Sequence, residues 1–282
     1  MTTKLRVSSS VIGFKERAEL TWGLKEWDGV DDPCEELVFF GLYHERDFSV
    51  FETYQGKRIV FWCGSDITRL IADYERRRIL KNYPDTIHYC ENQLEHDELQ
   101  AVGFESTIIP SFLDNINKFP LSFKVPKEGE PWKLWLCAHP EREEEYGITL
   151  AKRMAKLDNE IEFHIYGVSK PEKEEELRGI VYHGKVPEQQ LNEEIREYQS
   201  GFRPNQHDGV SEVTVKSILL GQYPITRIKY DQTMQYINET QLLECIKELK
   251  TKLEPNYDTR AHWLKILNQF PWCKKEFWNP EV

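Results

Sequence analysis

Short apolar segments that alternate with amphipathic segments dominate the first half of this chain. The apolar segments are residues 37–40, 58–62, 86–89 and 107–109. Runs this short, with apolar side chains on both faces, are typical of strands buried in a parallel sheet. The amphipathic segments at 67–80 and 92–102 have helical periodicity, and Gly103 follows the second one as a helix C-cap. The pattern predicts repeated βα units.

A polar stretch at 114–131 interrupts this alternation, which then starts again. Its mixture of Asn, Lys, Gly and Pro is typical of an interdomain connection. Beyond it, the same reasoning predicts strands at 132–138, 161–166 and 180–183, and helices at 146–157 and 188–198. We therefore predict an α/β protein of two Rossmann-like βαβ domains that face a shared cleft, with an abbreviated N-terminal domain.

The predicted boundaries are 1–118 for the N-terminal domain, 119–260 for the second domain and 261–282 for a C-terminal tail. The tail contains a dense apolar cluster that includes Trp263, Phe270, Trp272, Phe277 and Trp278. Such a cluster needs a surface on which to bury its side chains. We expect it to pack back on the first domain.

The charge balance and the scattered cysteines exclude several classes of protein. The 282 residues include 37 Lys and Arg against 48 Asp and Glu, a formal net charge of -11, so no bulk binding of nucleic acid is expected. The N-terminus lacks the apolar core of a signal peptide, and no apolar run approaches the roughly 20 residues of a membrane span. We therefore expect a cytoplasmic protein. Six cysteines without a CxxC pair, and eight histidines without HxxxH or HExxH spacing, predict neither a disulfide framework nor a dedicated metal site.

The segment 201–225 has the pattern of a strand, a polar loop, a helix and a second strand. In an open α/β sheet, a polar loop between a strand and a helix amino terminus is where phosphorylated ligands bind. Arg203 can fork onto two phosphate oxygens, Ser211 can cap the helix, and Lys216 adds a point charge. The alternative interpretation is a purely structural loop.

Asp208, Glu212 and Lys216 recur every four residues in this segment. If the helix extends back to Asp208, the three side chains share one face. They then either line a binding site or form an exposed ladder of ion pairs.

The order of elements from 132 to 225 resembles the GT-B glycosyltransferases, most nearly the retaining family 4. In that family a Glu-x7-Glu loop precedes a helix that ends in Ala-x-x-x-Gly-x-Pro-Val, and residues 221–225 here, Gly-Gln-Tyr-Pro-Ile, resemble this end. Counting back places the first acidic position on Asp208 and the second, normally a ribose-binding Glu, on Lys216. Lys216 at this second position departs from the family pattern. The family's Arg and Lys diphosphate clamp has no clear equivalent in 138–147, where Arg142 is the only cation.

The resemblance implies transfer of a sugar from a nucleotide-diphosphate sugar to a hydroxyl of a glycan or another acceptor, with retention of anomeric configuration. Arg142, Arg203, Ser211 and Lys216 would then hold the donor diphosphate. Asp208, a catalytic candidate, and His207 would orient the sugar, and Glu212 would hold the ribose. No cofactor is implied beyond the nucleotide sugar as co-substrate.

Polar residues also follow two apolar strands of the first domain, at 41–47 and 63–66. Gly41, His44, Glu45 and Ser65 should cluster with Asp66 at one sheet edge, which is where an acceptor would lie. Such a hydroxyl needs a proton acceptor, and His44, Asp66 or Glu45 can serve if burial tunes the pKa towards neutrality.

Two of these residues on the acceptor side also have a purely structural interpretation. Asp66 lies in the sequence Ser65-Asp66-Ile67-Thr68, which is also a good helix start, so N-capping is its alternative role. His88 ends a predicted strand on the acceptor side, and a satisfied structural histidine is its alternative.

The absence of other enzyme motifs, and the change in the family motif at Lys216, determine which other functions compete with glycosyl transfer. The chain has no GxGxxG, Walker lysine loop or GxSxG elbow, which weakens dehydrogenase, NTPase and hydrolase interpretations. Two alternatives to glycosyl transfer stay open: a non-catalytic nucleotide- or glycan-binding protein, and a nucleotide-sugar epimerase or phosphorylase of the same fold.

Overall fold

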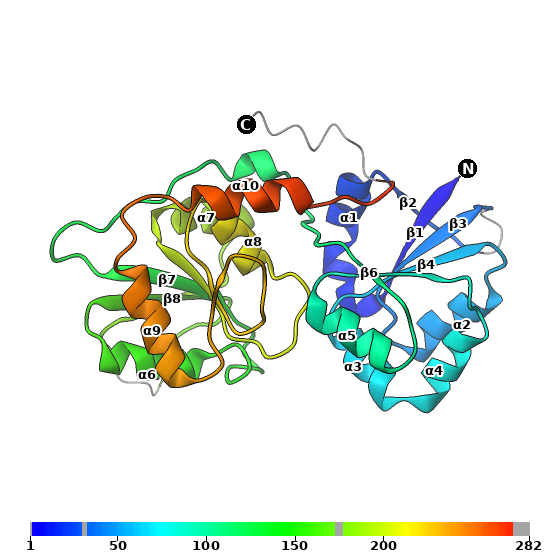
Figure 1. Cartoon of the computed structure of the whole chain (residues 1–282), viewed down its shortest axis with the longest axis horizontal. Helices are drawn as coiled ribbons and strands as arrows, with labels where there is room; N and C mark the ends of the chain where they lie inside the picture. The colour runs from blue at the N-terminus through cyan, green and yellow to red at the C-terminus, as the bar shows by residue number, and fades with distance from the viewer. Residues whose placement is uncertain (1, 30–32, 173–176, 273–282) are drawn as a thin grey trace. The chain divides into compact units, whose positions relative to one another are not determined.

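The computed structural model describes residues 2–29, 33–172 and 177–272. The chain divides into two compact units. The first unit is built from the residues up to Ile116, from His207–Val210 and from the described residues after Lys265; the second holds Asn117–Gln206 and Ser211–Lys265 (Figure 1). Each unit contains a six-stranded sheet in which every pairing is parallel.

The sheet of the first unit has the strand order β2-β1-β3-β4-β5-β6. Its strands are β1 (Thr3–Val7), β2 (Lys25–Glu26), β3 (Glu36–Phe40), β4 (Lys57–Phe61), β5 (Ile87–Cys90) and β6 (Thr107–Ile108). Its helices are the 3-10 helix η1 (Ser9–Phe14), α1 (Lys15–Trp22), α2 (Glu45–Thr53), α3 (Ser65–Ala72), α4 (Tyr74–Lys81) and α5 (Gln93–Ala101). Strands β3 to β6 lie where the apolar segments predict them.

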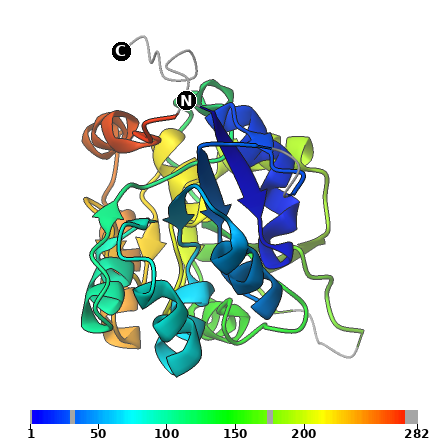
Figure 2. The same ribbon diagram turned by 90° about the vertical axis from the view of Figure 1, so that its right-hand side faces the viewer.

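Strand β3 is apolar at successive positions because helices cover both faces of the sheet. Val38 and Phe40 pack on one face, together with Trp22 of α1. Leu37 and Phe39 pack on the other face, together with side chains of α2, α3, α4 and α5. Figure 2 shows this unit from the side, with α1 beside the strands. Each of these buried side chains contributes about 1.5–3 kcal/mol of transfer free energy.

Two parts of the first unit differ from the sequence analysis. No element was predicted before residue 37, yet β1 pairs with β3 along its whole length, from Thr3 opposite Glu36 to Val7 opposite Phe40. The predicted helix at 67–80 is two helices, because the Asp73 carboxylate accepts hydrogen bonds from the backbone N–H groups of Glu75 and Arg76 and so starts α4.

The sheet of the second unit has the strand order β12-β11-β10-β7-β8-β9. Its strands are β7 (Trp132–Cys137), β8 (Ile161–Tyr166), β9 (Ile180–Gly184), β10 (Ser200–Arg203), β11 (Ile225–Thr226) and β12 (Met234–Gln235). Its helices are α6 (Ile148–Leu157), α7 (Glu188–Glu194), α8 (Glu212–Leu219), α9 (Glu239–Leu249) and α10 (Tyr257–Ile266), with the 3-10 helices η2 (Ile116–Lys118) at its start and η3 (Ile195–Glu197) after α7. The predicted α/β class with two βαβ sheets is confirmed.

Helix α8 lies unusually close to β10, and a glycine permits this approach. A Cβ atom at Gly201 would lie 2.9 Å from the Val213 carbonyl oxygen and 3.0 Å from Ser217 Cβ. The Ser217 hydroxyl accepts a hydrogen bond from Gly201 N and donates one to Gln222 Oε1. Trp135 of β7 also donates to Gln222 Oε1, at 3.0 Å. This buried network fixes the position of α8 against the two central strands.

The predicted apolar tail divides between the units. Trp263, in α10, donates a hydrogen bond to the Asp231 carbonyl of the second unit. Phe270 and Trp272 instead pack around Trp22 in the first unit, with ring centroids 5.3 and 6.0 Å away. Phe277 and Trp278 lie outside the described residues.

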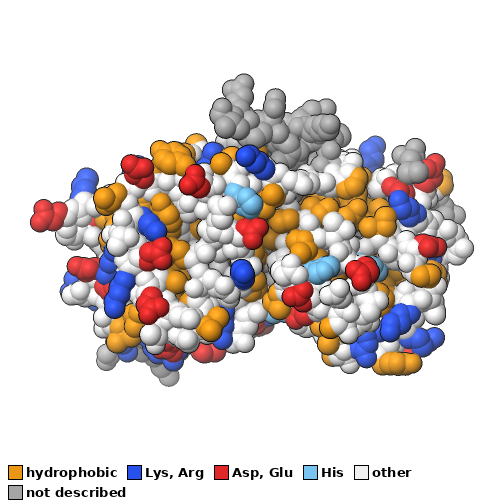
Figure 3. Space-filling model, viewed as in Figure 1, with side chains coloured by type: hydrophobic (Ala, Val, Ile, Leu, Met, Phe, Trp, Pro, Cys, Tyr) orange, Lys and Arg blue, Asp and Glu red, His pale blue; other side chains and the backbone are white. Residues whose placement is uncertain are grey.

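No helix of the described ranges is long and apolar enough to cross a membrane. On the face that Figure 3 shows, acidic and basic side chains of the described residues are interspersed over most of the surface. Mixed charge of this kind gives weak attraction for a long polyanion.

Candidate functional site

The second sheet reverses its direction of winding at β7. From β7 the chain proceeds through β8 and β9 on one side, and it then returns to β10, β11 and β12 on the other side. The carboxyl ends of β7 and β10 therefore flank a topological switch point, where open α/β sheets bind their ligands. Cys137 ends β7 and Arg203 ends β10.

Two arginines contact the same aromatic ring at this edge of the second sheet. The Cζ atom of Arg203 lies 4.9 Å from the centroid of the Tyr146 ring, and that of Arg142 lies 5.7 Å from it. Arg142 also donates from Nε to Glu145 Oε2 at 2.6 Å. The structure thus brings together two of the predicted donor-binding cations, from the β7–α6 loop and from β10.

Helix α8 presents its N-terminus at the same switch point. Ser211 is its N-cap, and the Ser211 hydroxyl accepts a hydrogen bond from Val213 N at 3.2 Å. Because the helix starts at Glu212, Asp208 lies outside it, and the condition for a face shared by all three residues is not met. Glu212 and Lys216 do share a face, with 3.4 Å between Oε2 and Nζ.

Lys216 is buried, and carboxylates of the protein already balance its charge. Its Nζ lies 3.2 Å from Glu188 Oε1, 3.4 Å from Glu212 Oε2 and 5.6 Å from the centroid of the Phe119 ring. The charge that Lys216 offers to a phosphate is therefore smaller than that of an isolated lysine. Burial also raises the pKa of the neighbouring Cys137 thiol to about 11, so this thiol is neutral at pH 7.

The first sheet has its own switch point, between β1 and β3. Asp47 braces this edge: its Oδ2 accepts hydrogen bonds from Ser8 Oγ at 2.6 Å, from Tyr43 N at 3.1 Å and from His44 N at 3.0 Å. His44 Nε2 lies 2.8 Å from Ser10 Oγ. The predicted His44 therefore faces a serine loop that the sequence analysis missed, since it did not identify β1. Alternating Lys4-Leu5-Arg6-Val7 before three serines was the available signal.

The other predicted residues at this edge have modest local roles. Gly41 has a φ of 77° and donates from its backbone N to the Phe61 carbonyl at 2.9 Å. Glu45 and Ser65 are exposed first residues of α2 and α3.

Asp66 is fully buried, and its carboxylate accepts hydrogen bonds from backbone N–H groups instead of facing solvent. Its Oδ1 accepts hydrogen bonds from Cys63 N at 3.0 Å and from Ile67 N at 3.1 Å, and its Oδ2 accepts one from Leu42 N at 3.2 Å. The N-cap of α3 is Gly64, so Asp66 does not cap the helix in the usual way. Burial raises the pKa of Asp66 to about 6, and these backbone donors limit the rise.

We predict that Asp66→Asn lowers the free energy of unfolding by about 1–2 kcal/mol, because one carboxylate oxygen is replaced by an amide that cannot accept from Leu42 N. Urea unfolding measures this loss, with the exposed Asp85→Asn as the matched control. Equal stability of the two variants would show that Asp66 does not brace the loops.

His88 lies in the core of the first unit. It is 7% exposed, accepts a hydrogen bond from Trp62 Nε1 at 3.3 Å and stacks on that ring at 6.0 Å. Burial lowers the pKa of His88 to about 4, so the ring is neutral at pH 7. The structure favours the alternative of a satisfied structural histidine over an acceptor-side group.

A buried pair of carboxyl groups, which the sequence analysis did not assign to the site, lies at the start of α5. Glu91 accepts hydrogen bonds from Ser111 Oγ at 2.5 Å and from Val210 N at 2.8 Å. Glu95 Oε2 accepts from Glu91 N at 2.7 Å. Burial raises the pKa of Glu91 to about 8 and that of Glu95 well above its usual range. Burial therefore favours the protonated form of both groups.

Residues His207–Val210 belong to the first unit. His207 and Asp208 are therefore in a different unit from the remaining residues that were predicted to bind the donor, all of which belong to the second unit. His207 Nε2 lies 2.7 Å from Glu98 Oε2, which raises the pKa of His207 against the opposing effect of burial. The Asp208 carbonyl accepts a hydrogen bond from Asn92 Nδ2 at 2.9 Å. Both contacts hold this short segment against α5.

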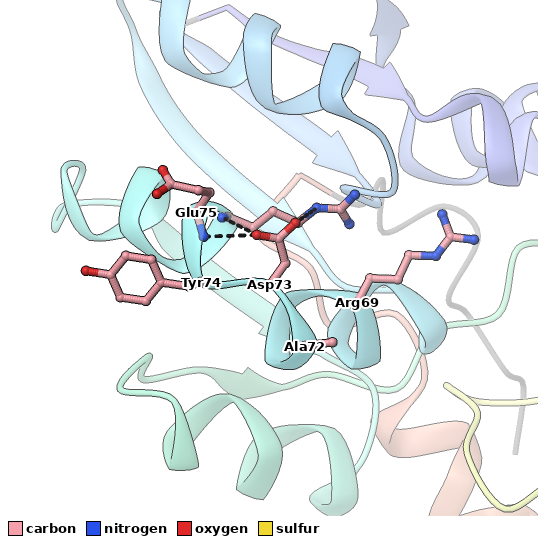
Figure 4. Close-up of a pocket in the computed structure, with 6 residues that line it drawn as sticks. Arg69, Ala72, Asp73, Tyr74 and Glu75 are labelled. Atoms are coloured by element: carbon pink, nitrogen blue, oxygen red, sulfur yellow. Dashed lines mark hydrogen bonds and ion pairs between the residues drawn. The ribbon is translucent and has the colours of Figure 1, made fainter.

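A shallow hollow of about 460 Å³ lies where α3 meets α4, and its lining is Arg69, Ala72, Asp73, Tyr74, Glu75 and Arg76 (Figure 4). In Figure 4 the Tyr74 ring and the Arg69 side chain project in different directions. The Asp73 carboxylate forms an ion pair with Arg76 and accepts hydrogen bonds from backbone N–H groups at the start of α4. Among the residues that the structure describes, no group of three His, Cys, Asp or Glu side chains is placed to hold a metal ion.

Comparisons with known proteins identify the fold. No protein-family model matches the chain, and no curated protein matches its sequence. Many solved structures share its architecture at low identity. Sucrose-phosphate synthase from Thermosynechococcus elongatus has a TM-score of 0.60 at 12% identity, over 91% of this chain and 73% of that one. WaaG, a glycosyltransferase involved in lipopolysaccharide biosynthesis, has a TM-score of 0.58 at 10% identity, over 98% and 97%.

TarM of S. aureus, in a complex with UDP, has a TM-score of 0.54 at 12% identity over 82% of this chain and 52% of that one. The chain thus spans about half the length of TarM. The similarity extends over both parallel sheets, in agreement with the predicted resemblance to GT-B proteins. The chain has the two-sheet α/β fold of these glycosyltransferases.

Proposed function

We propose that this chain transfers a sugar from a nucleoside diphosphate sugar to an acceptor hydroxyl. The observation that carries the proposal is the pair Arg142 and Arg203 on the Tyr146 ring, at a switch point that also receives the N-terminus of α8. Guanidinium groups and helix N–H donors are the chemistry that binds a diphosphate. The fold shared with glycosyltransferases supports this choice over other phosphate-binding proteins.

The first unit supplies the acceptor side in this proposal. His44 and Ser10 lie at its switch point, and an imidazole is a side chain that can serve as a general base for an acceptor hydroxyl. Retention of anomeric configuration follows from the resemblance to family 4, and it is part of the proposal. Independence of a metal, which follows from the spacing of the histidines, and of a further cofactor are also part of it.

A second candidate function is a non-catalytic nucleotide-binding protein. The observation that favours it is Lys216, which stands at the family's acidic position and is neutralised by Glu188 and Glu212. Binding without turnover would distinguish it from the enzyme.

We expect a nucleoside diphosphate to raise the melting temperature of the chain. A ligand at about 100 times its dissociation constant stabilises the native state by about 2.7 kcal/mol. The test is a thermal-shift series with UDP, ADP, GDP and their sugars, and with the nucleosides as controls for binding through the base alone. A uniform lack of response to all diphosphates would refute the proposed donor site.

A further inference from the structure

Two histidines on neighbouring strands of the second sheet face each other. His164 of β8 and His183 of β9 are stacked, with ring centroids 5.1 Å apart, and His164 Nδ1 lies 2.9 Å from His183 Nε2. A carboxylate lies at each end of the pair: Glu162 Oε1 is 2.8 Å from His164 Nε2, and Glu194 Oε2 is 3.3 Å from His183 Nδ1. These four side chains form three consecutive contacts, and we call them the histidine chain.

Glu194, the last residue of α7, connects that helix to the sheet by polar contacts. Its Oε2 accepts a hydrogen bond from the Tyr166 hydroxyl at 2.6 Å and also faces His183. Among the seven residues of α7, all of which the structure describes, Asn192 alone is buried. The next buried apolar side chain is that of Ile195, in η3. The attachment of α7 itself therefore depends on polar contacts instead of a buried apolar face.

The histidine chain can hold only one additional proton while its three contacts are intact. Ionised carboxylates only accept hydrogen bonds, so three contacts need three N–H groups, and two neutral imidazoles supply two of them. One additional proton completes the chain. A second one places a hydrogen on both His164 Nδ1 and His183 Nε2, which are 2.9 Å apart. Two donors cannot form a hydrogen bond with each other, so this second proton breaks the contact between the rings.

Two tyrosine hydroxyls complete the surroundings of the pair. The Tyr198 hydroxyl lies 2.9 Å from His164 Nδ1 and 2.7 Å from the Tyr166 hydroxyl. Burial raises the pKa of both tyrosines, that of Tyr198 to about 12, so neither is ionised in acid or at neutral pH. The histidines and the two carboxyl groups are therefore the members of this cluster that can change charge in acid.

Burial disfavours a positive charge on the histidine pair. His164 is 7% exposed, and burial lowers its pKa to about 3, with further lowering by the charges of His183 and of Lys133 on β7. Burial also lowers the pKa of His183, although Glu194 and Glu162 oppose this shift. A histidine in water has a pKa of about 6.5. Below this pH, a form in which water reaches both rings therefore binds more protons than the docked form.

We propose that the histidine chain is an acid-sensitive device that controls the docking of helix α7 on the second sheet. When both rings take a proton from solvent, they repel each other and rotate apart, and α7 separates from β8 and β9. The helix also contains Glu188, whose Oε1 lies 3.2 Å from Lys216 Nζ. Separation of α7 therefore removes a carboxylate that balances the charge of Lys216 in α8.

Amide hydrogen exchange of the parent chain tests this device, with each rate corrected for the intrinsic effect of pH on exchange. The ratio of docked to separated forms falls about 10-fold per pH unit for each proton by which the two forms differ. Protection of the α7 amides should therefore fall by about 10-fold or more between pH 7.5 and pH 5.5.

Helix α9 serves as the internal reference for this measurement. It packs with Phe163 and Ile165, which lie on the face of β8 opposite His164. Its protection should change much less than that of α7 over the same pH range. Constant protection of α7, or an equal fall in both helices, would overturn the inference.

A double variant, His164→Gln with His183→Gln, removes both titrating rings and keeps polar side chains at the two positions. Its α7 protection should change by less than about 2-fold between pH 7.5 and pH 5.5. The matched control is His139→Gln, at an exposed histidine of the same unit, which should keep the parental fall. A parental fall in the double variant would assign the acid response to other groups and reject the device. If the double variant does not fold, the comparison of α7 with α9 in the parent chain still decides between the outcomes.

Discussion

Arg203→Ala is expected to bind a nucleoside diphosphate about 30- to 100-fold more weakly than the parent chain, with an unchanged melting temperature. The guanidinium lies at the end of β10 against the Tyr146 ring, where it can form two parallel hydrogen bonds to phosphate oxygens. Loss of a bidentate, charge-assisted contact costs about 2–3 kcal/mol, which gives the expected change in affinity. Calorimetric titration with UDP, ADP or GDP measures it.

The matched control for this experiment is Arg153→Ala. Arg153 is an exposed arginine of the same unit, and its Nη2 lies 2.8 Å from Glu239 Oε1. Arg203→Lys separates charge from geometry, since an ammonium keeps the charge but lacks the planar fork, and it should recover only part of the lost affinity. Equal affinities of Arg203→Ala and Arg153→Ala would exclude the proposed diphosphate site.

Strand β3 was predicted from the sequence because its surroundings are apolar on both faces. Strand β3 contains Leu37, Val38, Phe39 and Phe40, and its pattern alone indicates burial between two helical layers. Strand β1 was missed because only alternate positions are apolar, and Lys4 and Arg6 interrupt the signal. An alternating pattern of five residues does not separate a strand from a loop.

The candidate site was predictable where it follows from topology. Arg203 was identified because it ends a strand and precedes a helix, and that reasoning needs no contact between distant residues. Two partners could not be found in this way: Glu188, which pairs with Lys216, and Val210, which donates to Glu91. Glu188 lies 28 positions before Lys216, and Val210 lies 119 positions after Glu91, so only the folded chain brings them together.

Asp66 shows a different limit of sequence reasoning. Its place in Ser65-Asp66-Ile67-Thr68 is compatible with a helix start, and the helix does start there. The side chain nevertheless accepts from Leu42 N and Cys63 N, at the ends of two neighbouring strands. A local pattern therefore located the helix correctly, but it did not determine which backbone groups the carboxylate would satisfy.

The buried carboxyl pair makes stability depend on pH in a direction opposite to that of a salt-bridged acid. Burial raises the pKa of Glu91 from 4.5 to about 8. Between these values the folded chain holds a proton that the unfolded chain releases, so the free energy of unfolding falls as pH rises, by up to about 1.4 kcal/mol per pH unit. The penalty is absent below the unfolded pKa and complete above the folded one. Asp208 lies near both members of the pair and Asp66 lies near Glu95, and their negative charge acts in the same direction.

We predict that Glu91→Gln removes the contribution of Glu91 to this pH dependence and is more stable than the parent chain at pH 8. Glutamine mimics the protonated acid: its Oε1 can accept from Val210 N, and its Nε2 can donate to Ser111 Oγ once that hydroxyl rotates. Urea unfolding at pH 5.5, 7 and 8 should give a slope that is lower by up to about 1.4 kcal/mol per pH unit than that of the parent chain. The exposed Glu105→Gln should keep the parental slope, because it changes the net charge equally without touching the pair. Parallel slopes for all three proteins would mean that Glu91 is ionised in the folded chain at neutral pH, and that the contact with Val210 is a carboxylate hydrogen bond instead.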